Sequence, residues 1–166
     1  MSSTNVSAPS RVSLRRYKRS DEPNLGALLM DAEVMRYVED GRPLAAAAVT
    51  GLVTKILAIY RDDPTFFIWA VQENDECAGH AELKRRRGRT EYELIYFLER
   101  ARWGRGLGGR VVDLIVKEAE AREIPFVIAT VDGRNVASIA ILKRRAFVRD
   151  DDLSAELACE AFHRSL

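Results

Sequence analysis

Residues 98–110, L-E-R-A-R-W-G-R-G-L-G-G-R, decide the fold of this chain. Four glycines fall between positions 104 and 109, and an apolar run at 92–98 precedes them. Apolar residues with the spacing of a helix face follow them as far as Ala119. These features predict a strand, then a glycine-rich turn, then the N-terminus of a helix.

A glycine-rich turn that opens a helix favours an anionic ligand. The first N–H groups of a helix have no partner inside it, and the helix dipole attracts negative charge to that end. Glycine permits positive φ and lets a ligand approach the backbone. Arg102, Arg105 and Arg110 add positive charge around the turn. The stretch therefore predicts a phosphate or pyrophosphate site.

The glycine pattern alone leaves several interpretations open. Gly104-x-Gly106-x-x-Gly109 satisfies the dinucleotide-binding pattern, and Asp132 follows Gly109 by 23 residues, near where an acid would hold the ribose. The phosphate loop of NTPases is excluded because no Gly-Lys-Ser/Thr follows. A glycine-rich turn without a ligand also stays open.

Composition and length restrict the class of protein. The 166 residues suit one domain, and 26 basic against 25 acidic residues leave a net charge of +1, which gives no general attraction to nucleic acid or membrane. Two distant cysteines form neither a disulfide framework nor a zinc pattern, and no metal site is predicted. Polar residues interrupt the apolar window 44–60, and 1–10 lacks the apolar core of a signal peptide. A cytoplasmic protein without a membrane span is expected.

The pattern of the whole chain predicts an α/β protein. Residues 1–10 are small and polar and are expected to be a disordered tail, with one domain over 11–166. The expected strands span 11–18, 66–72, 77–84, 92–98, 125–131, 146–149 and, more weakly, 157–162. The expected helices span 25–29, 31–38, 43–60, 104–123 and 135–145.

The links between these elements predict the topology. The three strands over 66–98 have short connections, so they should form antiparallel hairpins. The continuous apolar run at 125–131 suits a buried strand that a crossover helix places parallel to its predecessor. About 100 residues precede the glycine turn, whereas in the dinucleotide-binding fold the turn follows the first strand, which argues against that fold.

The order of elements, together with W-G-R-G-L-G-G at 103–109 and N-V-A-S-I-A-I-L-K-R-R-A-F at 135–147, resembles the GNAT superfamily of acetyl-CoA-dependent N-acetyltransferases. Within it, the chain is similar to the group around the ribosomal-protein N-terminal acetyltransferases. The resemblance covers 11–150. It implies a single-domain GNAT fold with a mixed, mostly antiparallel sheet of six or seven strands, splayed between the fourth and fifth strands, and helices on both faces.

The resemblance also implies a cofactor site for acetyl-CoA, the co-substrate. The family's pyrophosphate loop, Arg/Gln-x-x-Gly-x-Gly/Ala, matches Gly106 and Gly108, with Trp103 in place of Arg or Gln. Pantetheine would lie in the splay beside Leu98, and Asn135 would hydrogen-bond its arm. The implied cofactor residues are Phe97, Leu98, Trp103, Gly104, Arg105, Gly106, Leu107, Gly108, Gly109, Asn135 and Ser138.

The implied reaction moves acetyl directly from the thioester to a primary amine, on a protein N-terminus or a small molecule. The amine is mostly protonated near neutral pH, so a base is needed. Glu93 is the first candidate, because family members often use a glutamate on this strand. Strand alternation places it on one face with Ile95 and Phe97. Glu82 and His80 are the second and third candidates.

The group that reprotonates the CoA thiolate is a separate question. Some members of the family carry a tyrosine in the second motif, where this chain has Leu142. Ser138 or a water would then serve as the acid. Tyr96 either lines the substrate cleft or is a core aromatic residue.

Other functions stay open on sequence alone. The chain could be a non-catalytic acyl-CoA-binding module or, with less support, a dinucleotide-binding oxidoreductase. The basic run 84–89 is a solvated hairpin tip or attracts an acidic partner, and its lack of interleaved aromatics argues against nucleic acid. The sequence does not identify the acceptor amine. Edge pairing through the last strand would give a homodimer.

Overall fold

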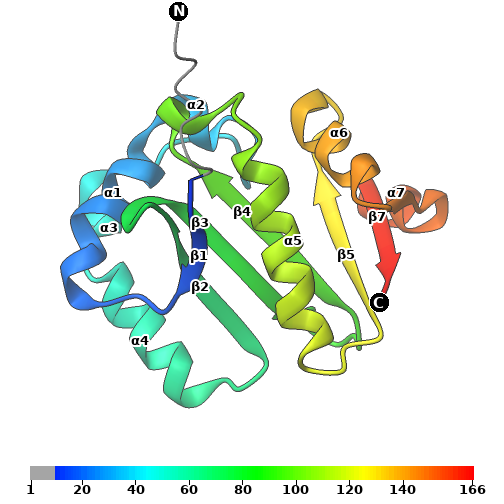
Figure 1. The fold of residues 1–166 in the computed structure, drawn as a ribbon, viewed down its shortest axis with the longest axis horizontal. Coiled ribbons are helices and arrows are strands. Elements are labelled where there is room, and N and C mark those ends of the chain that lie inside the picture. Colours follow the sequence, from blue (N-terminus) through cyan, green and yellow to red (C-terminus); the bar gives the residue numbers. More distant parts are fainter. Residues whose placement is uncertain (1–9) are drawn as a thin grey trace, which may run out of the picture.

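Seven strands form one sheet in the order β1-β2-β3-β4-β5-β7-β6 in the computed structural model, which describes residues 10–166 (Figure 1). The strands are β1 Val12–Arg15, β2 Phe66–Glu73, β3 Glu76–Arg85, β4 Tyr92–Leu98, β5 Phe126–Val131, β6 Val148–Arg149 and β7 Glu160–Ser165. The α-helices are α1 Glu22–Met30, α2 Ala32–Met35, α3 Ala46–Val49, α4 Leu52–Asp62, α5 Leu107–Glu120, α6 Val136–Arg144 and α7 Asp151–Leu157. Two 3₁₀ turns, η1 Arg19–Asp21 and η2 Arg100–Arg102, complete the elements.

The strand pairing confirms the predicted fold class. β4 and β5 are parallel, and every other neighbouring pair is antiparallel. β2 and β3 are joined through Asn74 and Asp75, with φ of 51° and 67°. Two successive left-handed residues give the tight turn whose twist suits a hairpin. The α5 helix is the crossover that makes the β4–β5 pair parallel.

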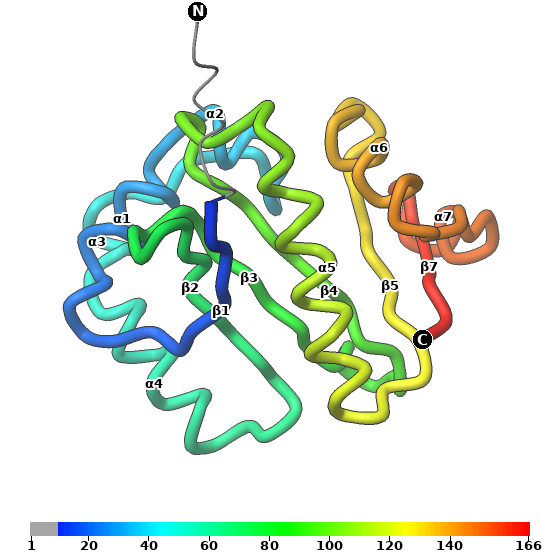
Figure 2. The backbone as a smooth tube through the Cα atoms, in the orientation of Figure 1, coloured from blue at the N-terminus to red at the C-terminus, as the bar shows by residue number. Residues whose placement is uncertain are grey.

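The β4–β5 pair separates along its length. The register has two partner pairs, Tyr92 with Val127 and Glu93 with Ile128. Figure 2 shows the two strands diverging from there toward the glycine turn. The Glu99 N–H donates to the Ala78 carbonyl on β3. Because backbone groups alternate between the two edges of a strand, those of Tyr96 and Leu98 face the diverging side.

Two apolar cores cover the two faces of the sheet. One lies against α5 and includes Leu94 and Leu98, with Tyr92 and Tyr96 packed against it. The other lies against α1 and α4, and Phe97 packs against it. The alternation predicted for β4 is therefore confirmed, and helices cover both faces as expected.

All the predicted helices have somewhat different bounds in the structure, and in two of them a glycine causes the difference. The helix expected over 43–60 is two helices, α3 and α4, because Gly51 between them has φ of +80°. Its N–H donates to the Glu22 carboxylate at 2.7 Å, which holds the break. The helix expected from 104 begins at Leu107, because Gly106 has φ of +75° and forms the N-cap. Glycine adopts this left-handed conformation without the penalty of a Cβ.

The C-terminal segment also differs from the prediction. No element was predicted between residues 149 and 157, but the Asp150 carboxylate accepts the Leu153 N–H at 2.9 Å and caps the helix α7 there. The last strand therefore starts at Glu160 rather than 157. It lies between β5 and β6, so it is not the sheet edge that the homodimer prediction used.

The predicted disordered tail lies mostly outside the described residues, which begin at position 10. Ser10 itself is held: its hydroxyl donates to Glu73 at 2.6 Å and its carbonyl accepts from Arg110. Within residues 10–166, no helix combines the length and apolar character needed to cross a membrane.

Candidate active site

The glycine turn between β4 and α5 leaves backbone donors open. Gly104 and Gly106 are exposed, with φ of +74° and +75°, and an added Cβ at either would meet nothing within 4 Å. The N–H groups of Leu107, Gly108 and Gly109 lie in the first turn of α5, where no intrahelical acceptor exists. This is the geometry of an anion site at a helix N-terminus.

The other two glycines of the motif also serve helix packing. A Cβ on Gly108 would lie 2.9 Å from Ile141 Cδ1 on α6, and one on Gly109 would overlap the Arg145 guanidinium. Arg145 Nε donates to the Gly109 carbonyl at 2.5 Å, and its guanidinium pairs with Asp113. Their lack of a side chain therefore lets α6 approach α5, a role that the sequence analysis did not assign to them.

Trp103 fixes the turn to the end of β4. Its indole Nε1–H donates to the Leu98 carbonyl at 2.9 Å, while the side chain remains 46% exposed. The Leu98 side chain is buried against α5. Both residues belong to the predicted cofactor site, and the structure brings them together at the open end of the splay.

Carboxylates hold two of the three arginines around the turn. Arg102 pairs with Glu73, Glu76 and Glu99 at 2.9 to 3.1 Å, and hydrogen bonding to these carboxylates raises the pKa of Arg102. Arg110 pairs with Glu73. The positive charge that these two arginines were expected to add at the turn is therefore paired with carboxylates. Arg105 is exposed and donates to the Ala101 carbonyl.

A second contact crosses the splay from β4 to α6. The Tyr96 hydroxyl donates to Ser138 Oγ at 3.5 Å, and burial raises the pKa of Tyr96. Asn135 accepts the Ser138 N–H at 3.1 Å, so it caps α6. Leu142, at the position of the family's tyrosine, is buried in the core. The hydroxyl nearest Ser138 thus comes from β4 rather than from α6, which sequence reasoning missed.

Glu93 lies where the β4–β5 register ends, on the face of β4 opposite α5. Its Oε1 accepts from Thr130 Oγ1 at 2.5 Å, and Arg86 Nε lies 3.9 Å from Oε2. The side chain is 13% exposed. Thr130 is a contact that sequence reasoning missed, although it is the only residue with a polar side chain in the run 125–131.

The second and third base candidates belong to one buried hydrogen-bonded chain. Tyr17 OH lies 2.8 Å from His80 Nδ1, and His80 Nε2 lies 2.8 Å from Glu82 Oε1. Burial raises the pKa of Tyr17 well above its usual value, so its hydroxyl stays protonated and donates to Nδ1. His80 Nε2–H then donates to Glu82. Burial is the largest influence on the pKa of Glu82 and acts to raise it, but hydrogen bonds and charge interactions with His80 and Lys84 together outweigh burial, so the net shift is downward. Both ring nitrogens of His80 are thus engaged.

Replacing Tyr17 with phenylalanine is expected to destabilise the fold by about 1–3 kcal/mol, because a buried His80 nitrogen loses its donor. His80 is 4% exposed and stacks on Phe97 at 4.7 Å between ring centroids, so water does not readily replace the lost bond. Urea denaturation followed by circular dichroism measures the change. An unaltered midpoint would show that the Tyr17–His80 bond contributes nothing.

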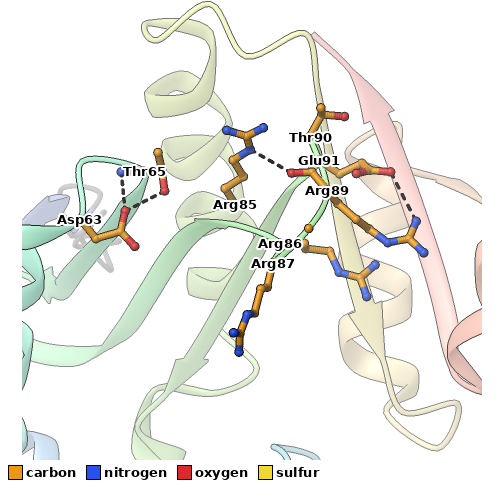
Figure 3. Close-up of a pocket in the computed structure, with 9 residues that line it drawn as sticks. Asp63, Thr65, Arg85, Arg86, Arg87, Arg89, Thr90 and Glu91 are labelled. Atoms are coloured by element: carbon orange, nitrogen blue, oxygen red, sulfur yellow. Dashed lines mark hydrogen bonds and ion pairs between the residues drawn. The ribbon is translucent and has the colours of Figure 1, made fainter.

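The basic hairpin between β3 and β4 lies at the opposite end of β4 from the glycine turn. It borders a pocket of about 720 Å³ that is lined by Asp63, Thr65 and residues 85–91 (Figure 3). Arg85 Nε donates to the Arg89 carbonyl, and Arg89 pairs with Glu91 at 3.6 Å (Figure 3). Arg86 turns back toward Glu93. Carboxylates therefore compensate part of this charge, as expected of a solvated tip.

The site thus lies in an α/β protein in which a parallel strand pair diverges beside a glycine turn and a helix N-terminus. The family model described as an acetyltransferase (GNAT) domain matches residues 11–148. The chain belongs to this family and is an acetyltransferase, which confirms the predicted resemblance. The element order is not that of a dinucleotide-binding fold.

Solved structures of acetyltransferases share the fold. The RimL ribosomal L7/L12 α-N-protein acetyltransferase in complex with coenzyme A has a TM-score of 0.77 at 13% identity, covering 93% of this chain and 94% of that one. The ribosomal-protein-alanine N-acetyltransferase of Brucella melitensis has a TM-score of 0.74 at 18% identity, and the match covers 93% of this chain and 99% of that one. An aminoglycoside acetyltransferase in complex with coenzyme A has a TM-score of 0.74 at 16% identity, and the match covers 93% of this chain and 95% of that one. No curated protein sequence matches the chain.

Proposed function

We propose that this acetyltransferase uses acetyl-CoA as its co-substrate and transfers the acetyl group directly to a primary amine. The observation that carries the proposal is the divergence of β4 from β5 beside the open N-terminus of α5. Structural neighbours bear names of enzymes for ribosomal proteins and aminoglycosides, which supports an amine acceptor on a protein N-terminus or a small molecule.

The residues at the open end of the splay fit coenzyme A. The exposed Gly104 and Gly106 and the free N–H groups at 107–109 would hold the pyrophosphate. The backbone groups of Tyr96 and Leu98 that face the splay would pair with pantetheine as an added strand does. Asn135 and Ser138 border the same opening, because Tyr96 reaches Ser138. Bound acetyl-CoA supplies the thioester.

Protein groups would move two protons in the reaction. Glu93 accepts a proton from the acceptor amine, whose nitrogen then forms the bond to the carbonyl carbon as the carbon–sulfur bond breaks. Ser138, hydrogen-bonded to the Tyr96 hydroxyl, would give its proton to the leaving sulfur and be reprotonated by the second proton that the nitrogen loses as it becomes an amide. The backbone N–H of Leu98 would stabilise the charge that develops on the carbonyl oxygen. A positioned base contributes about 10²- to 10⁴-fold in rate.

A non-catalytic acyl-CoA-binding module is the second candidate. It is favoured by the environment of Glu93, whose carboxylate already accepts from Thr130 and faces Arg86. It is also favoured by the buried Leu142 at the tyrosine position. Both candidates share the cofactor site and differ in turnover alone.

The two cysteines support a cytoplasmic setting as part of the proposal. Cys77 and Cys159 are free thiols. Desolvation raises the pKa of each, so both remain protonated at neutral pH and are weak nucleophiles. Free thiols are usual in a reducing compartment.

Calorimetry of the purified protein with acetyl-CoA, CoA and NADH tests the proposal. Saturable 1:1 binding of acetyl-CoA and CoA, without binding of NADH, is the expected result. A screen of primary amines and N-terminal peptides, read by release of the CoA thiol, then identifies the acceptor. Folded protein that binds neither CoA nor acetyl-CoA would refute the cofactor assignment.

Gly106→Val is expected to weaken CoA binding by about tenfold or more. A β-branched residue at φ of +75° costs about 1–2 kcal/mol of strain, and relieving it displaces the donors of the first turn of α5. Gly51→Val is the matched control, because Gly51 also has positive φ, caps α4, and lies outside the splay. Calorimetry should find CoA binding reduced in the first variant only. If Gly106→Val and Gly51→Val bound CoA with equal affinity, the glycine turn would not be part of the cofactor site.

A further inference from the structure

One buried carboxylate links both ends of the glycine turn. Glu73, at the end of β2, is 6% exposed. Its Oε2 accepts from Arg102 Nη1 and its Oε1 from Arg110 Nη2, each at 3.1 Å. Ser10 Oγ donates to Oε1 at 2.6 Å. No other carboxylate among residues 10–166 pairs with both arginines.

The two arginines bracket the turn. Arg102 ends η2, directly before Trp103, and Arg110 lies in the first turn of α5, directly after Gly109. The turn itself contains two left-handed glycines, Gly104 and Gly106, which restrict its shape little. Glu73 therefore supplies a fixed point, from a strand distant in sequence, to which both ends of the flexible turn are attached.

The charge of Glu73 opposes anion binding. A carboxylate beside a pyrophosphate site repels the ligand and neutralises two nearby guanidinium groups. Its contribution to binding must therefore be geometric. Arginines paired in this way hold defined positions, since breaking a buried pair leaves an uncompensated charge.

We propose that Glu73 is a positioning residue for the pyrophosphate turn. By holding Arg102 and Arg110 it fixes the separation of the two ends of 103–109, so that the free N–H groups of α5 converge on one anion. The inference rests on the coenzyme A site proposed above. It assigns affinity to the placement of backbone donors rather than to arginine charge.

Glu73→Gln and Glu76→Gln form a matched pair of variants. Each removes one negative charge near the turn and one partner of Arg102, but Glu76 is exposed and does not contact Arg110. A glutamine at 73 presents its NH₂ to one of the two arginine donors, so one end of the turn is released. If charge alone mattered, both variants would bind CoA more tightly.

Calorimetry with CoA is the test. Glu73→Gln should raise the Kd for CoA by about tenfold, the effect of one lost hydrogen bond to a charged group, and Glu76→Gln should leave it unchanged or lower it. Thermal melting measured alongside separates folding from binding. A lower Tm for Glu73→Gln with an unchanged Kd would overturn the proposal, as would tighter binding in both variants.

Arg110→Gln is the alternative variant if Glu73→Gln does not fold. The Arg110 side chain is more exposed than that of Glu73, and its replacement breaks the same connection between the two ends of the turn. The double variant Glu73→Gln/Arg110→Gln should bind CoA no more weakly than either single variant. Each substitution by itself already breaks the one connection between Arg102 and Arg110. Additive losses would contradict the shared role. Wild-type protein that fails to bind CoA would refute the cofactor site itself, which is a different outcome.

Discussion

Glu93→Gln is expected to lower kcat by about 10²- to 10⁴-fold and to leave the Kd for acetyl-CoA unchanged. The amide has the shape of the carboxylate and its oxygen can still accept from Thr130 Oγ1. It cannot take up the proton that the acceptor amine must lose. Because Glu93 lies at the inner end of the splay, away from the glycine turn along β4, the substitution should not disturb the cofactor.

The measurement combines steady-state kinetics, with the acceptor found in the amine screen, and calorimetry with acetyl-CoA. Glu82→Gln is the control, because Glu82 lies on the neighbouring strand opposite Ile95 and shares the face of Glu93. If only Glu82→Gln lost turnover, the catalytic base would be Glu82 on β3 rather than Glu93. A protein that binds acetyl-CoA but acetylates no amine in the screen would favour the binding-module hypothesis.

Gly79→Val is expected to destabilise the fold by about 3 kcal/mol, the upper range for overpacking. Gly79 on β3 pairs with Leu98 on β4. An added Cβ would overlap the Phe97 carbonyl oxygen and lie 2.6 Å from Leu98 Cδ2 and 3.0 Å from Leu98 Cα. The conflict is with backbone, which cannot rotate away, so the end of β4 must move toward the splay.

Chemical denaturation measures the loss of stability, and calorimetry at low temperature measures the accompanying loss of CoA affinity. Gly133→Val is the control at the same end of the sheet, where an added Cβ would meet Glu160 Cγ at 3.5 Å, an ordinary contact. It should change stability by less than about 0.5 kcal/mol. If the two variants were equally stable, the close β3–β4 approach at Gly79 would have no energetic significance.

Much of the fold followed from local pattern. The apolar run 92–98 became β4 with the predicted bounds, and the run 125–131 became its parallel partner. Asn135 caps α6 as its position before an apolar helix face predicts. Errors occurred where one residue decided an element boundary, as at Gly51 and Asp150. Glycine conformation and side-chain caps depend on surroundings that hydrophobic spacing does not record.

The candidate site likewise has parts that could be predicted from the sequence and parts that could not. The anion turn could be found from sequence, because its donors come from the first residues of one helix. The sequence also indicated which face of β4 carries Glu93. The partners of these groups could not be found. Thr130 reaches Glu93 across 37 residues of chain, and Tyr96 reaches Ser138 across 42.

The sequence by itself determined the order of the strands, most of the helices, the family, and the position of the glycine turn, because each depends on hydrogen bonds and apolar spacing within a short segment. Only the tertiary structure decided that Glu73 links Arg102 to Arg110 and that Tyr17 orients His80 from 63 residues away. Those contacts arise when the sheet brings β1, β2 and β3 together beside the turn. A side chain's choice among several arginines or carboxylates depends on distances that no spacing along the chain encodes.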